Sequence, residues 1–156
     1  MMPKSGKRFS DKLMRKKKAK RFRVGRSRTG LGLFATGEIA KHALIVEYCG
    51  RRIPTARAQE IERRRANKYM FEIDSRWTID GSSRRNLARY VNHFCEPNVE
   101  AELVRGRMMY RALAPIAAGE EITADYGEEY YELYLAASGC RCADCAAREN
   151  SLTSRA

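Results

Sequence analysis

Apolar residues along the chain fall into short runs separated by turn residues, rather than into long helical stripes. The run at residues 43–48 is rich in β-branched side chains and is ended by Gly50, which predicts a strand. Arg105-Gly106 has the composition of a hairpin turn. Gly30 to Ala35 is apolar and punctuated by glycine. Further strands are expected at residues 22–24, 69–74, 77–80, 99–104, 107–114 and 121–126.

Helical spacing is confined to three short segments. Residues 54–66 carry Glu and Arg at helical spacing, with Thr55 as the expected N-cap. Residues 86–93 are expected to form a helix with Leu87, Tyr90 and Val91 facing inward. A third helix is expected at residues 130–136, before Gly139. Many short strands with two or three short helices predict an α+β, mainly β fold. The absence of an ordered strand–helix–strand series excludes a doubly wound nucleotide-binding sheet.

The composition is that of a globular domain. The chain has 156 residues, 44% of them hydrophobic and 32% charged, which suits one domain with a single core. No apolar run reaches the roughly 18 residues of a membrane span, and no secretory signal is visible. We therefore expect a soluble intracellular protein with no membrane partner. It would lie in the nucleus if eukaryotic or acting on a host, and in the cytoplasm if bacterial.

The net charge of +12 is concentrated at one end of the chain. Residues 1–29 contain 13 Lys and Arg against one acid, whereas basic and acidic residues balance from Gly30 onward. Residues 1–21 are predicted to be a disordered basic tail. One interpretation is a solubilising segment, and the other is nonspecific contact of residues 1–29 with nucleic acid phosphates. Because aromatic residues are almost absent there, base stacking is not expected.

Three of the five cysteines, Cys140, Cys142 and Cys145, lie within six residues. Such crowding favours metal ligation over a disulfide framework, and intracellular thiols stay reduced. Reduced thiols without a metal are the alternative.

The most specific segment runs from Asn86 to Asn98. It places Asn92 and His93 where the chain is expected to turn, followed by Cys95 and then Pro97, which fixes the turn. A histidine alone would more often be a core or capping residue, but this combination is hard to reach by chance.

Five blocks together resemble the SET-domain protein methyltransferases. Arg89 to Asn98 is similar to the family's Asn-His-Ser-Cys-x-Pro-Asn signature, with Phe94 in place of serine. Glu120 to Gly127 resembles the segment that carries the catalytic tyrosine. Gly30-Leu31-Gly32 resembles the first cofactor-binding strip, Glu47-Tyr48-x-Gly50 the following strand, and Gly139 to Cys145 the post-SET zinc segment. The blocks occur in family order, and the resemblance covers residues 22–145.

The resemblance implies a fold, an activity and cofactors. The fold would be a SET domain (β-clip) at residues 22–134, made of small sheets with a pseudoknot. A post-SET zinc segment would follow at residues 135–149, and a flexible C-terminus at residues 150–156. The implied activity is transfer of methyl groups from S-adenosyl-L-methionine to the ε-amine of lysine in a basic protein, with histone as the default substrate.

The resemblance also implies residue roles. Tyr126 would be the catalytic tyrosine and Tyr48 would line the same site. The cofactor would be held by the following residues, together with Tyr126: Gly30, Leu31, Gly32, Arg89, Asn92 and His93. One structural Zn²⁺ would be held by Cys140, Cys142, Cys145 and, as the expected fourth ligand, Cys95. Cys49 is left over and is expected to be structural.

Two features depart from the family pattern. Ala124 stands where Phe or Tyr usually helps to set how many methyl groups fit, so the lysine channel has room for a dimethyl or trimethyl product unless another aromatic fills the space. The cysteine spacing Cys-x-Cys-x-x-Cys is also tighter than the family's usual Cys-x-Cys-x4-Cys.

Three classes of function are compatible with these patterns. The first is a catalytic lysine methyltransferase. The second is a catalytically inactive SET-like module that binds peptide or nucleic acid. The third is a zinc-stabilised nucleic-acid-binding protein that works through its basic tail. Intact Asn92, His93 and Tyr126 favour the first over the second, and the charge-neutral body argues against the third. An acidic stretch at residues 120–132 is either a solvated face or a rim that attracts a basic peptide.

Overall fold

A computed structural model describes residues 21–137, 139–142 and 145–147. Nearly all of the expected basic tail and the expected flexible C-terminus lie outside these ranges. Four of the 13 basic residues of the N-terminal segment, Arg21, Arg23, Arg26 and Arg28, lie in or beside the first strand. Part of the positive charge therefore belongs to the folded body. No helix in the described ranges combines the length and apolar character needed to cross a membrane.

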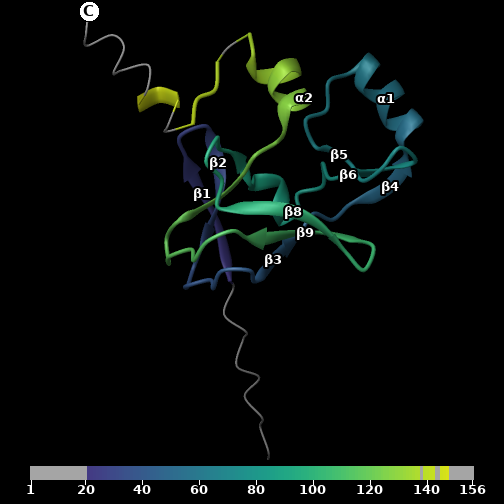
Figure 1. Ribbon diagram of the computed structural model, residues 1–156. Coiled ribbons are helices and arrows are strands. Elements are labelled where there is room, and N and C mark those ends of the chain that lie inside the picture. The colour runs from purple at the N-terminus through teal and green to yellow at the C-terminus, as the bar shows by residue number, and fades with distance from the viewer. Residues whose placement is uncertain (1–20, 138, 143–144, 148–156) are drawn as a thin grey trace, which may run out of the picture.

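The larger sheet has seven short strands in the order β1-β2-β10-β8-β9-β3, with β7 added beside β10. Figure 1 shows these strands in the body of the molecule. Their bounds are β1 Phe22–Ser27, β2 Gly30–Ala35, β3 Leu44–Glu47, β7 Asn92–His93, β8 Val99–Val104, β9 Arg107–Ala112 and β10 Glu121–Ala124. The strands predicted at residues 22–24, 43–48, 99–104, 107–114 and 121–126 are confirmed, as is the mainly β character of the fold.

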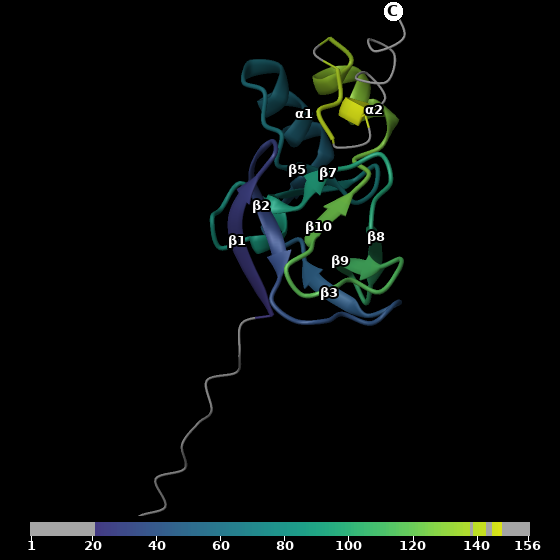
Figure 2. The same cartoon turned by 90° about the vertical axis from the view of Figure 1, so that its left-hand side faces the viewer.

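β10 pairs with β2, β7 and β8, so strands far apart in the sequence meet at β10 (Figure 2). We call this meeting of strands the crossing. β10 is antiparallel to β2 and parallel to β7 and β8. The segment that follows β7 stays bound to it, since the Phe94 N–H donates to the Ala124 carbonyl (3.0 Å) and the Asn98 N–H to the Thr123 carbonyl (3.1 Å). These contacts put the Asn92-His93 segment beside the end of β10, where Tyr126 follows.

A smaller sheet and the first helix form a separate lobe. The sheet order is β4-β6-β5, with β4 Arg51–Pro54, β5 Met70–Glu72 and β6 Trp77–Asp80. Helix α1, Thr55–Arg64, follows β4 directly. The helix was predicted, but Thr55 is not its N-cap. Pro54 holds that position, and the Thr55 hydroxyl instead donates to the Asp74 carbonyl (3.1 Å) and so ties the helix to the loop after β5.

The segment 86–93 is not the continuous helix that its spacing predicted. It forms a 3₁₀ turn, η1, at Leu87–Tyr90 and then strand β7. Leu87 is exposed, whereas Ala88 is buried. Asn92 and His93 are extended because they pair with β10. The backbone N–H and C=O groups that a helix would bond internally are bonded across the two strands instead.

The C-terminal part of the domain is helical, as expected, in two pieces. Helix α2 covers Glu128–Tyr130 and the π-helical turn η2 covers Tyr131–Leu135. The β8–β9 turn is also as predicted, since Arg105 and Gly106 both have positive φ, 48° and 76°.

The core lies between the sheets and η1. Its largest buried side chains include Leu33, Ile116, Ile122, Val91 and Val99, all below 2% exposed. Val91 is the residue before Asn92, so packing of the core fixes the backbone that presents the polar segment.

Candidate active site and metal centre

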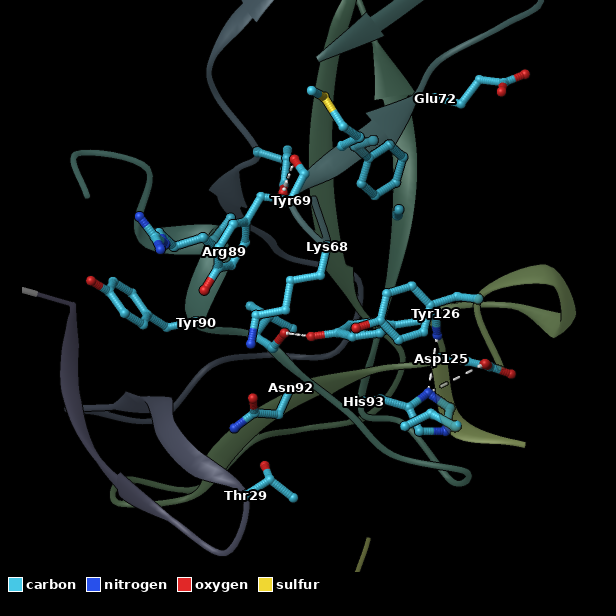
Figure 3. A pocket seen from close by; sticks show the side chains of 18 of the residues that line it. Thr29, Lys68, Tyr69, Glu72, Arg89, Tyr90, Asn92, His93, Asp125 and Tyr126 are labelled. Carbon is cyan, nitrogen blue, oxygen red and sulfur yellow. Dashed lines mark hydrogen bonds and ion pairs between the residues drawn. The ribbon is translucent and has the colours of Figure 1, made fainter. Parts of the chain in front are cut away.

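A cavity of about 910 Å³ lies between the larger sheet, the α1 lobe and the C-terminal segment. Segments far apart in the sequence meet there. Gly30 and Leu31 of β2, Asn92 and His93 of β7, and Tyr126 after β10 all line it. Figure 3 shows Tyr69, Arg89, Asn92, His93 and Tyr126 around this space. The sequence-predicted residues are thus brought together in one place, apart from those described below.

Asn92 is held by two elements. Its Nδ2 donates to the Leu31 carbonyl (3.0 Å) and to Glu121 Oε1 (2.8 Å). Glu121 Oε2 also accepts from the Ser27 hydroxyl (2.9 Å). A Cβ at Gly32 would lie 2.3 Å from Glu121 Oε1. Gly32 therefore leaves space for the Glu121 carboxylate that orients Asn92. Gly32 is not one of the described residues that line the cavity.

His93 is oriented by the segment after β10. Its Nδ1 accepts from the Tyr126 N–H (3.2 Å) and lies 3.7 Å from the Asp125 carboxylate. Burial lowers the pKa of His93, although the nearby Asp125 carboxylate opposes that shift. A neutral ring that accepts at Nδ1 carries its proton on Nε2, which faces Cys95 Sγ at 3.6 Å. His93 thus connects the cavity to the cysteine group.

Several tyrosines line the cavity. The Tyr126 hydroxyl donates to the Val91 carbonyl, and its ring packs edge-on against Tyr130 with centroids 4.6 Å apart. The Tyr48 hydroxyl donates to the Tyr69 carbonyl (2.8 Å). Burial raises the pKa of both Tyr48 and Tyr126 well above the ordinary value. Both phenols are therefore neutral hydrogen-bond donors at physiological pH.

Arg89 forms one wall beside these tyrosines. Its guanidinium lies over the Tyr69 ring, 4.0 Å from the centroid, and donates to the Ser82 carbonyl. Arg89 therefore fixes a neighbouring carbonyl and the orientation of Tyr69. This stacking brings together the η1 turn and the α1 lobe.

The four cysteines form a second, adjacent site. The thiols of Cys95, Cys140, Cys142 and Cys145 all lie within 4.8 Å of one another. Cys95 Sγ is 3.7 Å from Cys140 Sγ and 3.5 Å from Cys145 Sγ. Four thiolates around a tetrahedral zinc with bonds of 2.3 Å would be separated by about 3.8 Å. The donor set therefore fits one Zn²⁺, while Cys49 lies elsewhere, beside Asn86.

Two parts of the site differ from the expectation based on residue patterns. Ala124 is 2% exposed and, within the described ranges, is not part of the cavity wall. Tyr69 and Tyr110 do line the cavity, although no pattern in the sequence singled them out. Tyr110 lies in strand β9 and Tyr69 in the turn before β5. A single aromatic in a strand or beside one is equally typical of core residues, so the folded arrangement was needed to find them.

The acidic stretch is partly structural. Glu120 Oε2 accepts from the Ala117 N–H (2.8 Å), and Asp125 Oδ1 from the Gly127 N–H (2.9 Å). With Glu121 engaged by Asn92, three of these acids support turns and strands of the site.

The chain matches the SET domain family over residues 30–127. It is similar to a histone-lysine N-methyltransferase of Saccharomyces cerevisiae described as H3 lysine-4 specific, with 38% identity over 61% of this chain and 10% of the relative. Histone-lysine N-methyltransferase set-2 of Caenorhabditis elegans is 39% identical over 69% of this chain and 8% of the relative. The chain thus spans a tenth or less of the length of these relatives.

Solved structures agree with this likeness. A humanized mutant of the Chaetomium thermophilum Polycomb Repressive Complex 2, bound to the inhibitor GSK126, has a TM-score of 0.61 and 30% identity, covering 68% of this chain and 15% of that chain. The structure described as ctPRC2 in an autoinhibited conformation, bound to S-adenosylmethionine, has a TM-score of 0.62 and 30% identity over 70% of this chain and 15% of that chain.

The strand crossing, the cavity beneath it and the adjoining thiols define a SET-type domain with a cysteine-rich C-terminal segment. This chain belongs to the SET-domain family.

Proposed function

We propose that the chain transfers methyl groups from S-adenosyl-L-methionine to the ε-amine of a lysine in a basic protein, and that a histone is the substrate. The observation that carries this proposal is the convergence of Asn92, His93 and the buried hydroxyl of Tyr126 on one cavity. The names of the related histone-lysine N-methyltransferases and the S-adenosylmethionine bound in a structural neighbour support it.

The cavity has the features that such a reaction needs from a protein. S-adenosylmethionine supplies a methyl group already activated on a positively charged sulfur. Asn92 and His93 would hold the cofactor together with Gly30 and Leu31, whose carbonyl accepts from Asn92, and Arg89 also lines the cavity. The tyrosine-lined part would receive the lysine side chain. Alignment of the two reactants is the main contribution that these walls make.

The lysine must react as a neutral amine, although its reference pKa is about 10.4. A tyrosine-lined channel and the positive sulfur both disfavour the ammonium form. Tyr126 remains protonated because burial raises its pKa, so its hydroxyl can orient the amine or the methyl group without removing a proton. Tyr48, held by its bond to the Tyr69 carbonyl, packs the same wall.

We further propose that Cys95, Cys140, Cys142 and Cys145 hold one structural Zn²⁺. Cys140 and Cys142 also line the cavity, so ligation would fix the C-terminal segment over it. Loss of this Zn²⁺ would therefore loosen the part of the cavity wall formed by Cys140 and Cys142, and would leave Tyr126 and Asn92 unchanged.

A histone substrate would place the protein on chromatin. The name of the Saccharomyces cerevisiae relative points to histone H3, and the H3 tail is therefore the first substrate to test. The expected contact of residues 1–29 with nucleic acid would add nonspecific attraction to the same target.

The test is transfer of labelled methyl from S-adenosylmethionine to purified core histones by the full chain. Tyr126→Phe removes only the hydroxyl and should lower the rate roughly 100-fold, as loss of one catalytic donor does. Tyr131→Phe is the matched control, because Tyr131 is exposed and does not line the cavity among the described residues. Equal rates for wild type and Tyr126→Phe would refute the role of Tyr126. Saturable cofactor binding with no transfer to any histone would favour the inactive binding module instead.

A further inference from the structure

The strand register places small residues side by side across β10, β8 and β9. Ala124 of β10 pairs with Val99 of β8, and Val99 pairs with Ala112 of β9. All three are almost fully buried, and two are alanines. These three side chains fill less volume than a set with an aromatic at position 124 would fill. A larger side chain from a nearby strand position is therefore needed to pack this face of the sheet.

Tyr110 is that neighbour. It lies two residues before Ala112 on β9, so both side chains point to the same face of the sheet. Its cross-strand partner is Ala101, another small residue. Tyr110 is 4% exposed and belongs to the same core cluster as Ala124 and Tyr48. Unlike Ala124, it lines the cavity.

Tyr110 shares the cavity wall with the two tyrosines that would surround the lysine, because Tyr48, Tyr110 and Tyr126 all line the cavity. The pKa of Tyr126 is raised by burial and next by Tyr110. The pKa of Tyr48 is raised by the same two causes in the same order. Both pKa shifts agree with this shared position.

We propose that Tyr110 supplies the aromatic wall that Ala124 lacks, and that it limits how many methyl groups the target lysine can carry. This inference rests on the proposed function. It also reverses the expectation drawn from Ala124 alone, because the space that a small residue would open is filled from β9, on the far side of β8 from β10.

The physical reason is the space that each successive transfer requires. One transfer breaks the bond between sulfur and methyl, forms a bond between nitrogen and methyl, and releases one proton from nitrogen. The methylated amine must then turn its lone pair toward a new cofactor, which swings the first methyl into the channel wall. With the Tyr110 ring in that wall, the wild-type chain should yield mainly monomethyl-lysine.

The experiment measures mono-, di- and trimethyl-lysine by mass spectrometry on core histones after many turnovers with the full chain. Tyr110→Val removes the ring and keeps a residue suited to a strand. It should raise the ratio of di- plus trimethyl to monomethyl product about 10- to 200-fold, the range over which a pocket discriminates by one methylene. Tyr110→Val/Ala124→Phe returns an aromatic to the other strand and should restore monomethyl product. Tyr131→Phe is the control and should leave the distribution unchanged.

A second readout does not depend on turnover. Wild type, with S-adenosylhomocysteine present, should bind a histone H3 tail peptide carrying unmodified lysine more tightly than the same peptide carrying trimethyl-lysine. Tyr110→Val should reduce that preference, whereas Tyr110→Phe keeps the ring and should retain it. Tyr110→Leu also removes the ring and covers the case in which Tyr110→Val fails to fold.

The outcomes are separable. Mainly di- or trimethyl product from wild type, or an unchanged product ratio in folded Tyr110→Val or Tyr110→Leu, would overturn the role of Tyr110 while leaving the methyltransferase function intact. Absence of transfer by wild type would refute the proposed function. In that case the peptide readout still decides on Tyr110, since equal affinities for all peptide forms, or no binding of any form, would count against it.

Discussion

At the residue scale, Gly81 decides where Tyr48 can lie. A Cβ at Gly81 would be 2.3 Å from Tyr48 Cε1 and 2.5 Å from its hydroxyl oxygen. Gly81→Ala should push the ring away, weaken the bond from the Tyr48 hydroxyl to the Tyr69 carbonyl, and lower the free energy of unfolding by about 1–3 kcal/mol. Urea denaturation measures this change. Gly37→Ala is the control, because no atom lies within 4 Å of its Cβ position. Equal stability of both variants would contradict the packing argument.

Ionisation of Tyr126 is not expected to lower the transfer rate or the stability below about pH 10. The pKa of Tyr126 is raised above the ordinary 10.0, first by burial. The folded state therefore favours the neutral phenol, whose contribution to stability is complete below about pH 10 and is lost as the pH rises through the folded pKa. The transfer rate should rise with pH up to about 9.5, since more lysine is neutral. Single-turnover rates would show this limb, and a decline below pH 10 that Tyr126→Phe abolishes would contradict it.

At the scale of elements, the crossing at β10 depends on Asn98. Its Oδ1 accepts from the Thr123 N–H (2.9 Å), and its Nδ2 donates to the Glu121 carbonyl (2.8 Å). Asn98→Ala leaves both backbone groups without these partners and should cost about 1–3 kcal/mol of unfolding free energy. Asn67→Ala is the matched control, because Asn67 accepts only a local bond from the Tyr69 N–H. Thermal or urea unfolding compares the two, and an equal loss would show that the crossing adds nothing beyond a local turn.

The same crossing explains what the sequence could predict about the elements. Local signals sufficed for the β8–β9 hairpin, where Arg105-Gly106 accepts positive φ, and for helix α1. They failed at residues 86–93, because pairing of β7 with β10, more than 25 residues later, overrides helical spacing. A nonlocal partner of this kind leaves no mark on the segment itself.

The candidate site likewise contains residues that local sequence motifs reveal and residues whose role depends on nonlocal strand pairing. Asn92, His93 and Tyr126 lie in motifs that can be recognised along the chain, and the structure brings them to one cavity. The importance of Gly32 for Glu121 and the position of Tyr110 opposite Ala101 depend on which strands are neighbours. Strand order is a property of the folded sheet, so it was not accessible from residue types alone.

At the scale of the whole molecule, the C-terminal segment that carries part of the cysteine site also borders the cavity. Cys140, Arg141 and Cys142 line the cavity together with β2 and β7, and Cys95 follows His93 by two residues. Cys95→Ser, or removal of zinc by a chelator, should therefore release the segment and loosen His93 together. We expect affinity for S-adenosylmethionine to fall about tenfold, equal to about 1.4 kcal/mol.

Metal content and cofactor affinity, measured on the same protein sample, test this coupling without any measurement of activity. Cys49→Ser is the matched control, since Cys49 lies beside Asn86, away from the four thiols, and should retain both zinc and affinity. Full zinc content and wild-type affinity in Cys95→Ser would break the link between the two sites. Loss of zinc with unchanged affinity would show instead that β2, β7 and the segment after β10 hold the cofactor without help from the C-terminal segment.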